Sequence, residues 1–374
     1  MRGVACCIDI WIASKFQHMS KKDDIKKIWL ESFGDSQEYV DMYFDRVYAD
    51  SQGLILEKND KPVSSLLLQS YRMQFHGREV ETGYIAGAAT RKGSRGKGYM
   101  SELLLTTLAE AASRGMMAVE LIPEHGWLYD YYSRFDFAPV VLADAQRFTS
   151  LHAFPCSGKY VAVENPYDDA VFDTFSRLER ERPCTVVHSR RDFLNIIDDC
   201  RLSGGSFVCI RREDSTTPVA MAWAAMDADG ERLIVKELLG EDDDARAGAL
   251  KALREAYPDV EVTLLALPGQ GTPRGRLTQR GMIRIVNAAM ALDIIAATHP
   301  ELKLTLRITD RLMPENSHVY VIDDGKCEID DTLTGPYDFS VDAEIFARIL
   351  FSSEKTGDIL EFPSVRPHMS LMLD

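Results

Sequence analysis

The spacing of apolar residues changes several times along the chain and predicts an alternation of helices and strands. Residues 23–48 carry apolar side chains at helical spacing, with a break near Gly34. Runs that favour strands follow at 53–57, 63–69, 71–76 and 79–89. We therefore expect a mixed α/β fold for the first part of the chain.

The clearest single element is a helix that begins at Gly98. Met100, Leu104 and Leu108 recur every four residues and form one apolar stripe. Gly115 stands where a helix C-cap is expected, and a strand at 116–122 follows directly. This order of strand, glycine-containing loop, helix and strand is what a phosphate-bearing cofactor needs in an α/β domain.

The same order of elements occurs a second time. Strands are expected at 206–211, 219–226 and 232–239, then a helix at 243–257 and a strand at 260–267. We interpret this second unit as a degenerate internal repeat of the first. Beyond it, a strictly alternating strand at 303–309, a hairpin around Asp323-Asp324-Gly325 and a helix at 341–350 predict a small α+β unit.

Chain length agrees with several domains. A chain of 374 residues exceeds the size at which one hydrophobic core usually stops growing. Met19 resembles a second start position, so residues 1–18 are interpreted as an N-terminal extension. The predicted units are residues 19–150, 151–285 and 286–374.

Charge and cysteine content restrict the partners and the location. A net charge of −15 disfavours nucleic acid, which binds mainly through Lys and Arg, and suits small cationic molecules. No apolar run reaches the roughly 18 to 20 residues that cross a membrane. Seven cysteines without a C-x-x-C spacing favour neither a disulfide framework nor a metal site, and indicate a cytoplasmic protein.

Residues 90–99 combine four cationic side chains with three glycines. Glycines allow backbone N–H groups to turn inward, and the following helix offers free N–H donors and the positive end of its dipole. A pyrophosphate is therefore the expected guest, with Arg95 and Lys97 adding positive charge. The alternative is a solvated basic turn before a surface helix, but the flanking strand and amphipathic helix favour binding.

These residues resemble a known family. Arg95-Gly96-Lys97-Gly98 is similar to the R-x-x-G core of motif A in the GNAT superfamily of N-acetyltransferases, with 85–90 as its strand. Residues 132–137 resemble the Y-x-x-x-G-F element of that family, although Asp136 replaces the usual glycine. Met100 stands where most members have Gly or Ala, a feature shared with the Eis-like (enhanced intracellular survival) branch.

The resemblance implies a fold and a cofactor. Eis-like proteins join a GNAT domain, a second GNAT-like domain and a C-terminal sterol-carrier-like domain, which matches the three predicted units. Acetyl-CoA would lie between Tyr84 and Tyr132. The residues expected to bind it are Ala88, Ala89, Thr90, Arg95, Gly96, Lys97, Gly98, Tyr99 and Met100.

The repeat unit provides an internal comparison. Its loop at 239–244 carries four carboxylates where the first unit carries cations. Carboxylates suit a helix N-terminus but repel a pyrophosphate. We therefore expect coenzyme A to bind the first unit alone.

Acyl transfer from a thioester to an amine needs a neutral amine, a stabilised oxyanion and a protonated leaving thiolate. Backbone N–H groups of Ala88–Thr90 are candidates for polarising the thioester carbonyl. Tyr132 occupies the position of the family's general acid, and the ordinary phenol pKa of about 10 suits that role. Tyr129 and Tyr131 lie beside it in sequence, and such a cluster is also typical of simple packing.

The general base has more than one candidate. In Eis-like enzymes the C-terminal carboxylate reaches the active site, which here points to Asp374, with the apolar residues 371–373 as an anchor. Glu124 and His125, just after the strand at 116–122, are the alternatives. An ordinary carboxylate is a poor base for an ammonium group, so burial or a water relay is required.

The sequence thus predicts an acetyl-CoA-dependent N-acetyltransferase, and the resemblance to Eis-like proteins implies a homo-oligomer. Its acceptor would be a primary amine of a small cationic molecule: an amino sugar or aminoglycoside, a polyamine or a lysine side chain. Two alternatives belong to other classes. One is a non-catalytic acyl-CoA-binding regulator, and the other is a lipid-binding protein that uses the helix at 341–350.

Overall fold

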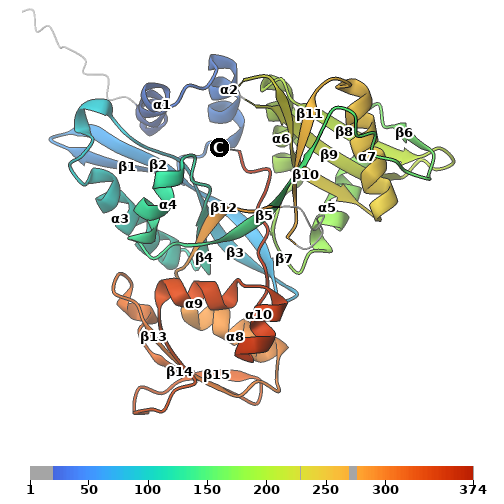
Figure 1. Cartoon of the computed structure of the whole chain (residues 1–374). Helices are drawn as coiled ribbons and strands as arrows, with labels where there is room; N and C mark the ends of the chain where they lie inside the picture. The colour runs from blue at the N-terminus through green and yellow to red at the C-terminus, as the bar shows by residue number, and fades with distance from the viewer. Residues whose placement is uncertain (1–19, 228, 269–275, 374) are drawn as a thin grey trace, which may run out of the picture.

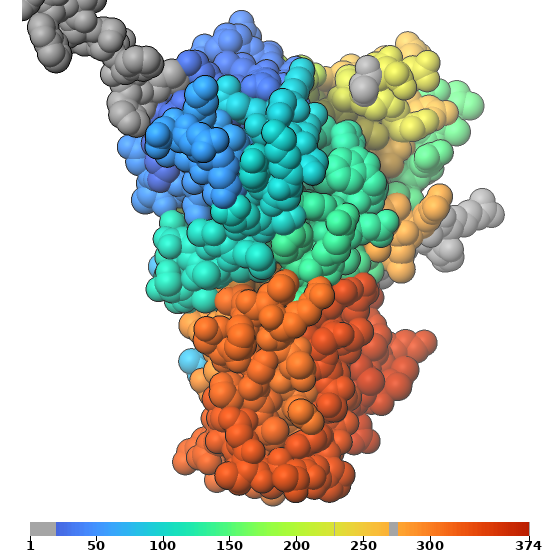
Figure 2. Space-filling view, turned by 90° about the vertical axis from the view of Figure 1, so that its left-hand side faces the viewer, coloured from blue at the N-terminus to red at the C-terminus, as the bar shows by residue number. Residues whose placement is uncertain are grey.

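A large mixed β-sheet and a separate small sheet organise the molecule (Figure 1). The computed structural model describes residues 20–227, 229–268 and 276–373; residues 1–18 and Asp374 therefore lie outside the described residues. The large sheet runs through the first two units, and the third unit sits below it (Figures 1 and 2). The expected mixed α/β class is confirmed. The described helices include none long and apolar enough to cross a membrane.

The first unit follows the predicted order of elements. It contains α1 (Lys21–Ser32), α2 (Gln37–Met42), a π-helical segment (Tyr43–Val47), β1 (Gly53–Lys58), β2 (Lys61–Phe75), β3 (Arg78–Thr90), α3 (Tyr99–Ser113), β4 (Ala118–Leu121), α4 (Gly126–Ser133) and β5 (Ala138–Phe148). The two strands predicted at 63–69 and 71–76 form one strand, β2. The polar Gln69 lies buried within this strand, and its side-chain amide donates to the Tyr43 hydroxyl at 3.0 Å.

The second and third units contain the remaining elements. The second has β6 (Tyr160–Ala162), α5 (Asp169–Arg180), β7 (Cys184–Val187), α6 (Arg190–Leu202), β8 (Ser206–Arg212), β9 (Pro218–Met226), β10 (Arg232–Gly240), α7 (Asp243–Ala256), β11 (Glu261–Ala266) and β12 (Arg276–Ile285). The third has α8 (Ala288–Thr298), β13 (Leu304–Thr309), β14 (Val319–Asp323), β15 (Lys326–Ile329), β16 (Phe339–Asp342), α9 (Ala343–Leu350) and α10 (Glu354–Leu360). Strand β10 pairs antiparallel with β9 and parallel with β11, as β3 does with β2 and β4.

Strand order shows that the first two units are interleaved. The order is β1-β2-β3-β4-β12-β5-β11-β10-β9-β8-β6, and β7 pairs with β2. Strand β12, which ends the second unit, lies antiparallel between β4 and β5 of the first unit. Strand β5 in turn pairs with β11. The hydrogen-bonded sheet is therefore continuous across the predicted boundary at residue 150 between the first and second units.

Helices cover both faces of this sheet. Leu103, Leu104 and Leu108 of α3 pack with Tyr132 and Phe137 against one face of the first unit. Helix α7 covers the corresponding face of the second unit. Helices α1, α2, α5 and α6 share one large core with residues of β2, β3 and β9. Helix α9 also packs against β5 and β12. The third unit therefore contacts the two strands through which the first and second units are interleaved.

A buried ion pair fastens the third unit to the sheet. The Arg284 guanidinium, on β12, donates to both carboxylate oxygens of Asp310 at 2.7 and 2.6 Å, and neither side chain is more than 1% exposed. Arg284 also donates to the carbonyl of Phe135, and Asp310 also accepts from the Asn316 amide. Each charge is therefore both paired and hydrogen-bonded, as burial requires.

The C-terminal segment returns from the third unit to the space between the other two (Figure 1). Its backbone joins β7, because Val186 N–H donates to the His368 carbonyl at 3.1 Å and His368 N–H donates to the Cys184 carbonyl at 3.0 Å. Met372 and Leu373 are buried in the large core. The last described residues thus lie inside the molecule.

Candidate active site

An opening in the sheet forms where β3 and β4 part. The two parallel strands pair only over Thr82–Tyr84 and Ala118–Glu120, after which β4 ends while β3 continues to Thr90. On its other side, β3 makes an irregular pairing with β2 in which Gly87 has φ +59°. A Cβ at Gly87 would lie 2.1 Å from Trp29 Cζ3, so only glycine fits. The predicted segment Ala88–Thr90 therefore borders the opening.

The loop after β3 leads directly into the N-terminus of α3. Gly96 and Gly98 have φ of +76° and +79°, and Gly98 is the N-cap of α3. No side chain caps this helix, and a Cβ at either glycine would meet nothing within 4 Å. The first-turn N–H groups of the helix, which include that of Tyr99, are therefore available to an anion.

The cations of this loop divide into two sets. Arg91 lies 3.6 Å from the Glu31 carboxylate, which also accepts from the Lys92 N–H. Arg95 and Lys97 are exposed and donate only to backbone carbonyls within the described chain, those of Thr90 and Gly93. The exposed charges, the open glycine surface and the uncapped helix together fit a pyrophosphate. Met100 is half-buried and packs on the α3 and α4 core.

Tyr132 lies on the same side of the sheet as α3. Its ring is 7% exposed and packs edge-on against Tyr131 and Phe137. Within the described chain, its hydroxyl makes no hydrogen bond of ordinary geometry. Burial and the neighbouring Tyr131 raise the pKa of Tyr132 above its usual value. The expected pKa near 10 is therefore wrong for the free protein, because burial disfavours the phenolate, and Tyr132 is fully protonated at neutral pH.

Asp136 has a backbone conformation that favours glycine, the residue usual at this position of the family motif. Its φ is +59°, in the left-handed region that Asp tolerates better than most residues. Its carboxylate lies 3.3 Å from the Arg311 guanidinium of the third unit. The departure from the family motif therefore preserves the turn after α4 and adds a contact to the third unit.

A buried carboxyl group that the sequence analysis missed lies on β4. Glu120 is fully buried, and neither of its oxygens makes a hydrogen bond of ordinary geometry in the described structure. Burial raises the pKa of Glu120 to about 8, although Thr82 and His188 partly offset this rise. The predicted alternatives, Glu124 and His125, are instead largely exposed, with side chains 66% and 59% accessible.

Charged residues at the centre of the molecule hold the C-terminal segment. Arg182 donates to both oxygens of Glu237 at 2.9 and 2.7 Å, and His368 Nε2 lies 2.9 Å from the same carboxylate. The Ser370 hydroxyl also donates to it at 2.5 Å. Burial alone would raise the pKa of Glu237, but Arg182 and His368 hold it well below its usual value. Glu237 is therefore an ionised anchor for the segment.

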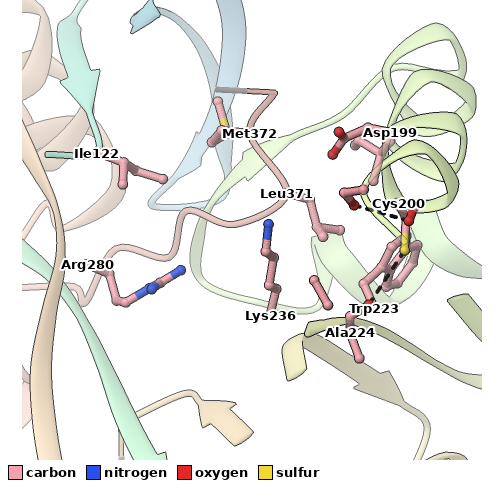
Figure 3. A pocket seen from close by; sticks show the side chains of 12 residues that line it. Ile122, Asp199, Cys200, Trp223, Ala224, Lys236, Arg280, Leu371 and Met372 are labelled. Atoms are coloured by element: carbon pink, nitrogen blue, oxygen red, sulfur yellow. Dashed lines mark hydrogen bonds between the residues drawn. The ribbon is translucent and has the colours of Figure 1, made fainter. Parts of the chain in front are cut away.

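Beyond this anchor, the segment forms one wall of a pocket (Figure 3). Leu371 and Met372 line the pocket together with Ile122, the residue that follows β4. Residues of α6, β9, β10 and β12 form the other walls. The pocket therefore lies at the end of β4, beside the point where β3 and β4 part. Leu371 has φ +55°, a strained conformation for a bulky residue.

The carboxylates of the acidic loop at 239–244 make hydrogen bonds within the second unit. The Asp242 carboxylate caps α7 by accepting from the Ala245 N–H at 2.7 Å. The Asp244 carboxylate accepts from the Tyr160 hydroxyl and from two backbone N–H groups, those of Ser157 and Gly158. The start of α7 is therefore capped by a side chain, whereas the start of α3 is not.

Comparisons with known proteins agree with this geometry. Residues 15–140 match the profile of the acetyltransferase (GNAT) domain family. The chain therefore contains a GNAT acetyltransferase domain, and this domain indicates an acyltransferase enzyme that uses an acyl-CoA donor. A search of curated protein sequences found no significant match.

Solved structures of similar fold cover nearly the whole chain. A conserved Enterococcus faecalis protein described as a probable N-acyltransferase aligns with a TM-score of 0.72 at 14% identity, over 94% of this chain and 96% of its own. A GCN5-related N-acetyltransferase from Anabaena variabilis gives 0.69 at 16% identity, over 93% and 95%. Eis1 from Mycobacterium abscessus gives 0.67 at 11% identity, over 91% and 90%. The fold is thus Eis-like, as the sequence motifs predicted.

Proposed function

We propose that this protein is a cytoplasmic acetyl-CoA-dependent N-acetyltransferase that transfers acetyl directly to a primary amine of a small molecule. The observation that carries the proposal is the position of the pocket. It lies at the end of β4, next to the parting of β3 and β4 and across the sheet from the α3 and α4 core. Donor and acceptor could therefore approach the same opening from two sides.

The donor site is proposed for the loop and helix that follow β3. Acetyl-CoA, when bound, supplies an activated acyl group as a thioester. The N–H groups at the start of α3 would bind its pyrophosphate, and Arg95 and Lys97 would add charge-assisted contacts. Backbone N–H groups of Ala88–Thr90 would orient and polarise the thioester carbonyl.

Two proton transfers complete the proposed mechanism. Tyr132 holds its proton in the free protein, and its hydroxyl has no described hydrogen-bond partner, so it is suited to protonate the leaving thiolate. The carboxylate at Asp374 is our proposed base, supported by the anchored segment that brings Leu371 and Met372 to the pocket. Glu120 is the second candidate, because its raised pKa suits removal of a proton from an amine.

The overall organisation is proposed on the same basis. The repeated pairing of β2, β3 and β4 in β9, β10 and β11 supports a second GNAT-like domain at 151–285. We also propose that residues 286–374 form a sterol-carrier-like domain and that the enzyme is a homo-oligomer. The apolar face of α9 packs into the protein core, which favours a structural role over lipid binding.

A thiol-release assay tests this function. Acetyl-CoA would be offered with polyamines, amino sugars, lysine peptides and amino acids to the wild type, to a variant lacking Asp374 and to Glu120→Gln. We expect turnover of some amine by the wild type and a loss of about a hundredfold in the variant that lacks the true base. Acetyl-CoA binding without thiol release from any amine would instead support a non-catalytic regulator, and co-purified lipid would support a lipid-binding protein.

A further inference from the structure

We propose that the pocket at the end of β4 recognises a carboxylate, so that the acceptor is a primary amine that also carries a carboxylate group, as an amino acid does. The inference rests on the proposed function and narrows its substrate class. It differs from the cationic acceptor that the net charge of the whole chain favours, because the charges that line the pocket have the opposite balance.

Two cations and one anion line the described part of the pocket. Lys236 of β10 and Arg280 of β12 point toward the pocket from neighbouring walls, and Asp199 of α6 lies across from them (Figure 3). Strands β5 and β11 lie between β12 and β10 in the sheet, and the side chains of Arg280 and Lys236 nevertheless line the same pocket. A second cation in the same small space would be repelled by them, whereas a carboxylate would be attracted.

Both cations occupy irregular positions in their strands. Strand β10 pairs Val235 with Ala224 but Glu237 with Trp223, so Lys236 is the extra residue of a bulge. Strand β12 pairs Gln279 with Leu142 but Gly281 with Val141, so Arg280 is an extra residue in the same sense. A bulge turns a side chain away from the regular alternation of a strand, and such bulges are frequent beside active sites.

Neither cation is used in the described structure. Lys236 and Arg280 make no hydrogen bond or ion pair with residues 20–227, 229–268 or 276–373. The neighbouring strand residues differ: Glu237 is paired with Arg182, and Arg284 with Asp310. Among the described residues, the two cations at the pocket therefore have no counter-charge, while the nearby buried charges are satisfied within the protein.

The remaining walls suit the rest of such an acceptor. Ile196, Trp223 and Ala224 form an apolar wall, and the buried indole N–H of Trp223 has no partner in the described structure. Ile122, which directly follows β4, lies on a different side of the pocket from Trp223 and Ala224 (Figure 3). A carboxylate on Arg280 and Lys236 would hold the acceptor at one end, and its amine could then extend toward the opening where the acyl group is expected.

Matched pairs of acceptors test the proposal. The thiol-release rate would be measured for several amino acids, for their carboxamides and for phosphoethanolamine, with wild type, Lys236→Gln and Arg280→Gln. Arg276→Gln is the control, because Arg276 is an exposed cation on the same strand as Arg280 and does not line the pocket. Calorimetric binding of N-acetyl amino acids and their amides would be measured in parallel.

We expect the wild type to prefer the acid over its amide by ten- to a hundredfold in kcat/KM. Each pocket variant should lose most of that preference because its kcat/KM for the acid falls while its kcat/KM for the amide is unchanged. The Arg276→Gln control should keep the preference. Equal use of acid and amide, a preference for polyamines, or a preference that survives both variants would overturn the proposal. A preference for phosphoethanolamine would overturn the carboxylate class.

The proposed function can fail separately. If no amine releases thiol, the calorimetric binding measurements test carboxylate recognition on their own. Tighter binding of N-acetyl amino acids than of their amides, lost in Arg280→Gln, supports carboxylate recognition without turnover. Equal binding of both by the wild type contradicts it.

Discussion

The His368 imidazole lies 2.9 Å from the Glu237 carboxylate, and this contact joins the C-terminal segment to a strand of the second unit. Burial and the Arg182 charge lower the pKa of His368, although Glu237 acts in the opposite direction. The imidazole is therefore neutral at physiological pH and donates to an anion that Arg182 already holds. The position of the pocket wall depends on this arrangement.

Replacing His368 should separate catalysis from donor binding. We expect His368→Ala to lower the free energy of unfolding by about 2 kcal/mol, the typical loss for a hydrogen bond to a charged group. It should also reduce kcat/KM for the amine, because Leu371 and Met372 lose their anchor, while acetyl-CoA affinity is unchanged. Denaturant unfolding and steady-state kinetics measure both. His318→Ala, at the more exposed His318–Asp331 contact, is the control, and an equal effect there would contradict the anchor.

Tyr132 should contribute to the chemical step and little to folding. Its hydroxyl has no described partner, so Tyr132→Phe should leave the melting temperature within a few degrees of the wild type. The loss of a general acid should reduce kcat by about a hundredfold or more. Tyr129→Phe, on the same helix, should retain nearly full activity. Comparable losses in the two variants would mean that the tyrosines act through packing.

Glu120 should make stability depend on pH. Its pKa is about 8 in the folded protein, against an ordinary 4.5 that we take for the unfolded chain. Between these values the folded state binds more protons, so the free energy of unfolding falls as pH rises, by at most about 1.4 kcal/mol per pH unit. This contribution is fully present below pH 4.5 and lost above pH 8.

Glu120→Gln should remove that slope. The variant should gain stability relative to the wild type from pH 5 to pH 8, which urea unfolding at several pH values would measure. A difference between the two proteins that does not change with pH would show that Glu120 ionises normally. If Glu120 is also the base, the same variant is more stable and less active at pH 8.

The buried pair between β12 and the third unit should be costly to break. Asp310→Ala leaves the Arg284 guanidinium buried without its counter-charge, and we expect a loss of about 3–5 kcal/mol in the free energy of unfolding. Asp331→Ala removes a more exposed partner, that of His318, and should cost about 1 kcal/mol or less. Thermal unfolding of both variants provides the measurement. Similar losses of stability in the two variants would mean that burial does not make the Arg284–Asp310 pair more costly to break than an exposed pair.

The sequence predicted what local signals determine. The segment Arg95–Gly98 and the helix after it combine glycines, charge and an apolar stripe within twenty residues, and the structure contains that loop and helix. Glu120 gave no such signal, since a polar residue in a short strand usually faces solvent. Its burial follows from the second unit, whose His188 and Cys184 approach it.

The pocket could not be predicted either, because it too depends on contacts between segments that are distant in the sequence. Lys236 and Arg280 became candidates only through the pairing of β10 with β9 and of β12 with β5. Those pairings join segments more than a hundred residues apart in the case of β12 and β5. A bulge is a property of two strands together, so neither strand alone reveals it.

Strand β12 also determines how the protein can be divided. A fragment that stops at residue 150 would contain every motif of the first unit, yet β4 and β5 would each lose the neighbour that β12 provides. Unpaired strand edges promote aggregation. The first unit is therefore not a detachable module: it must be expressed, exchanged or inherited together with the chain up to residue 285.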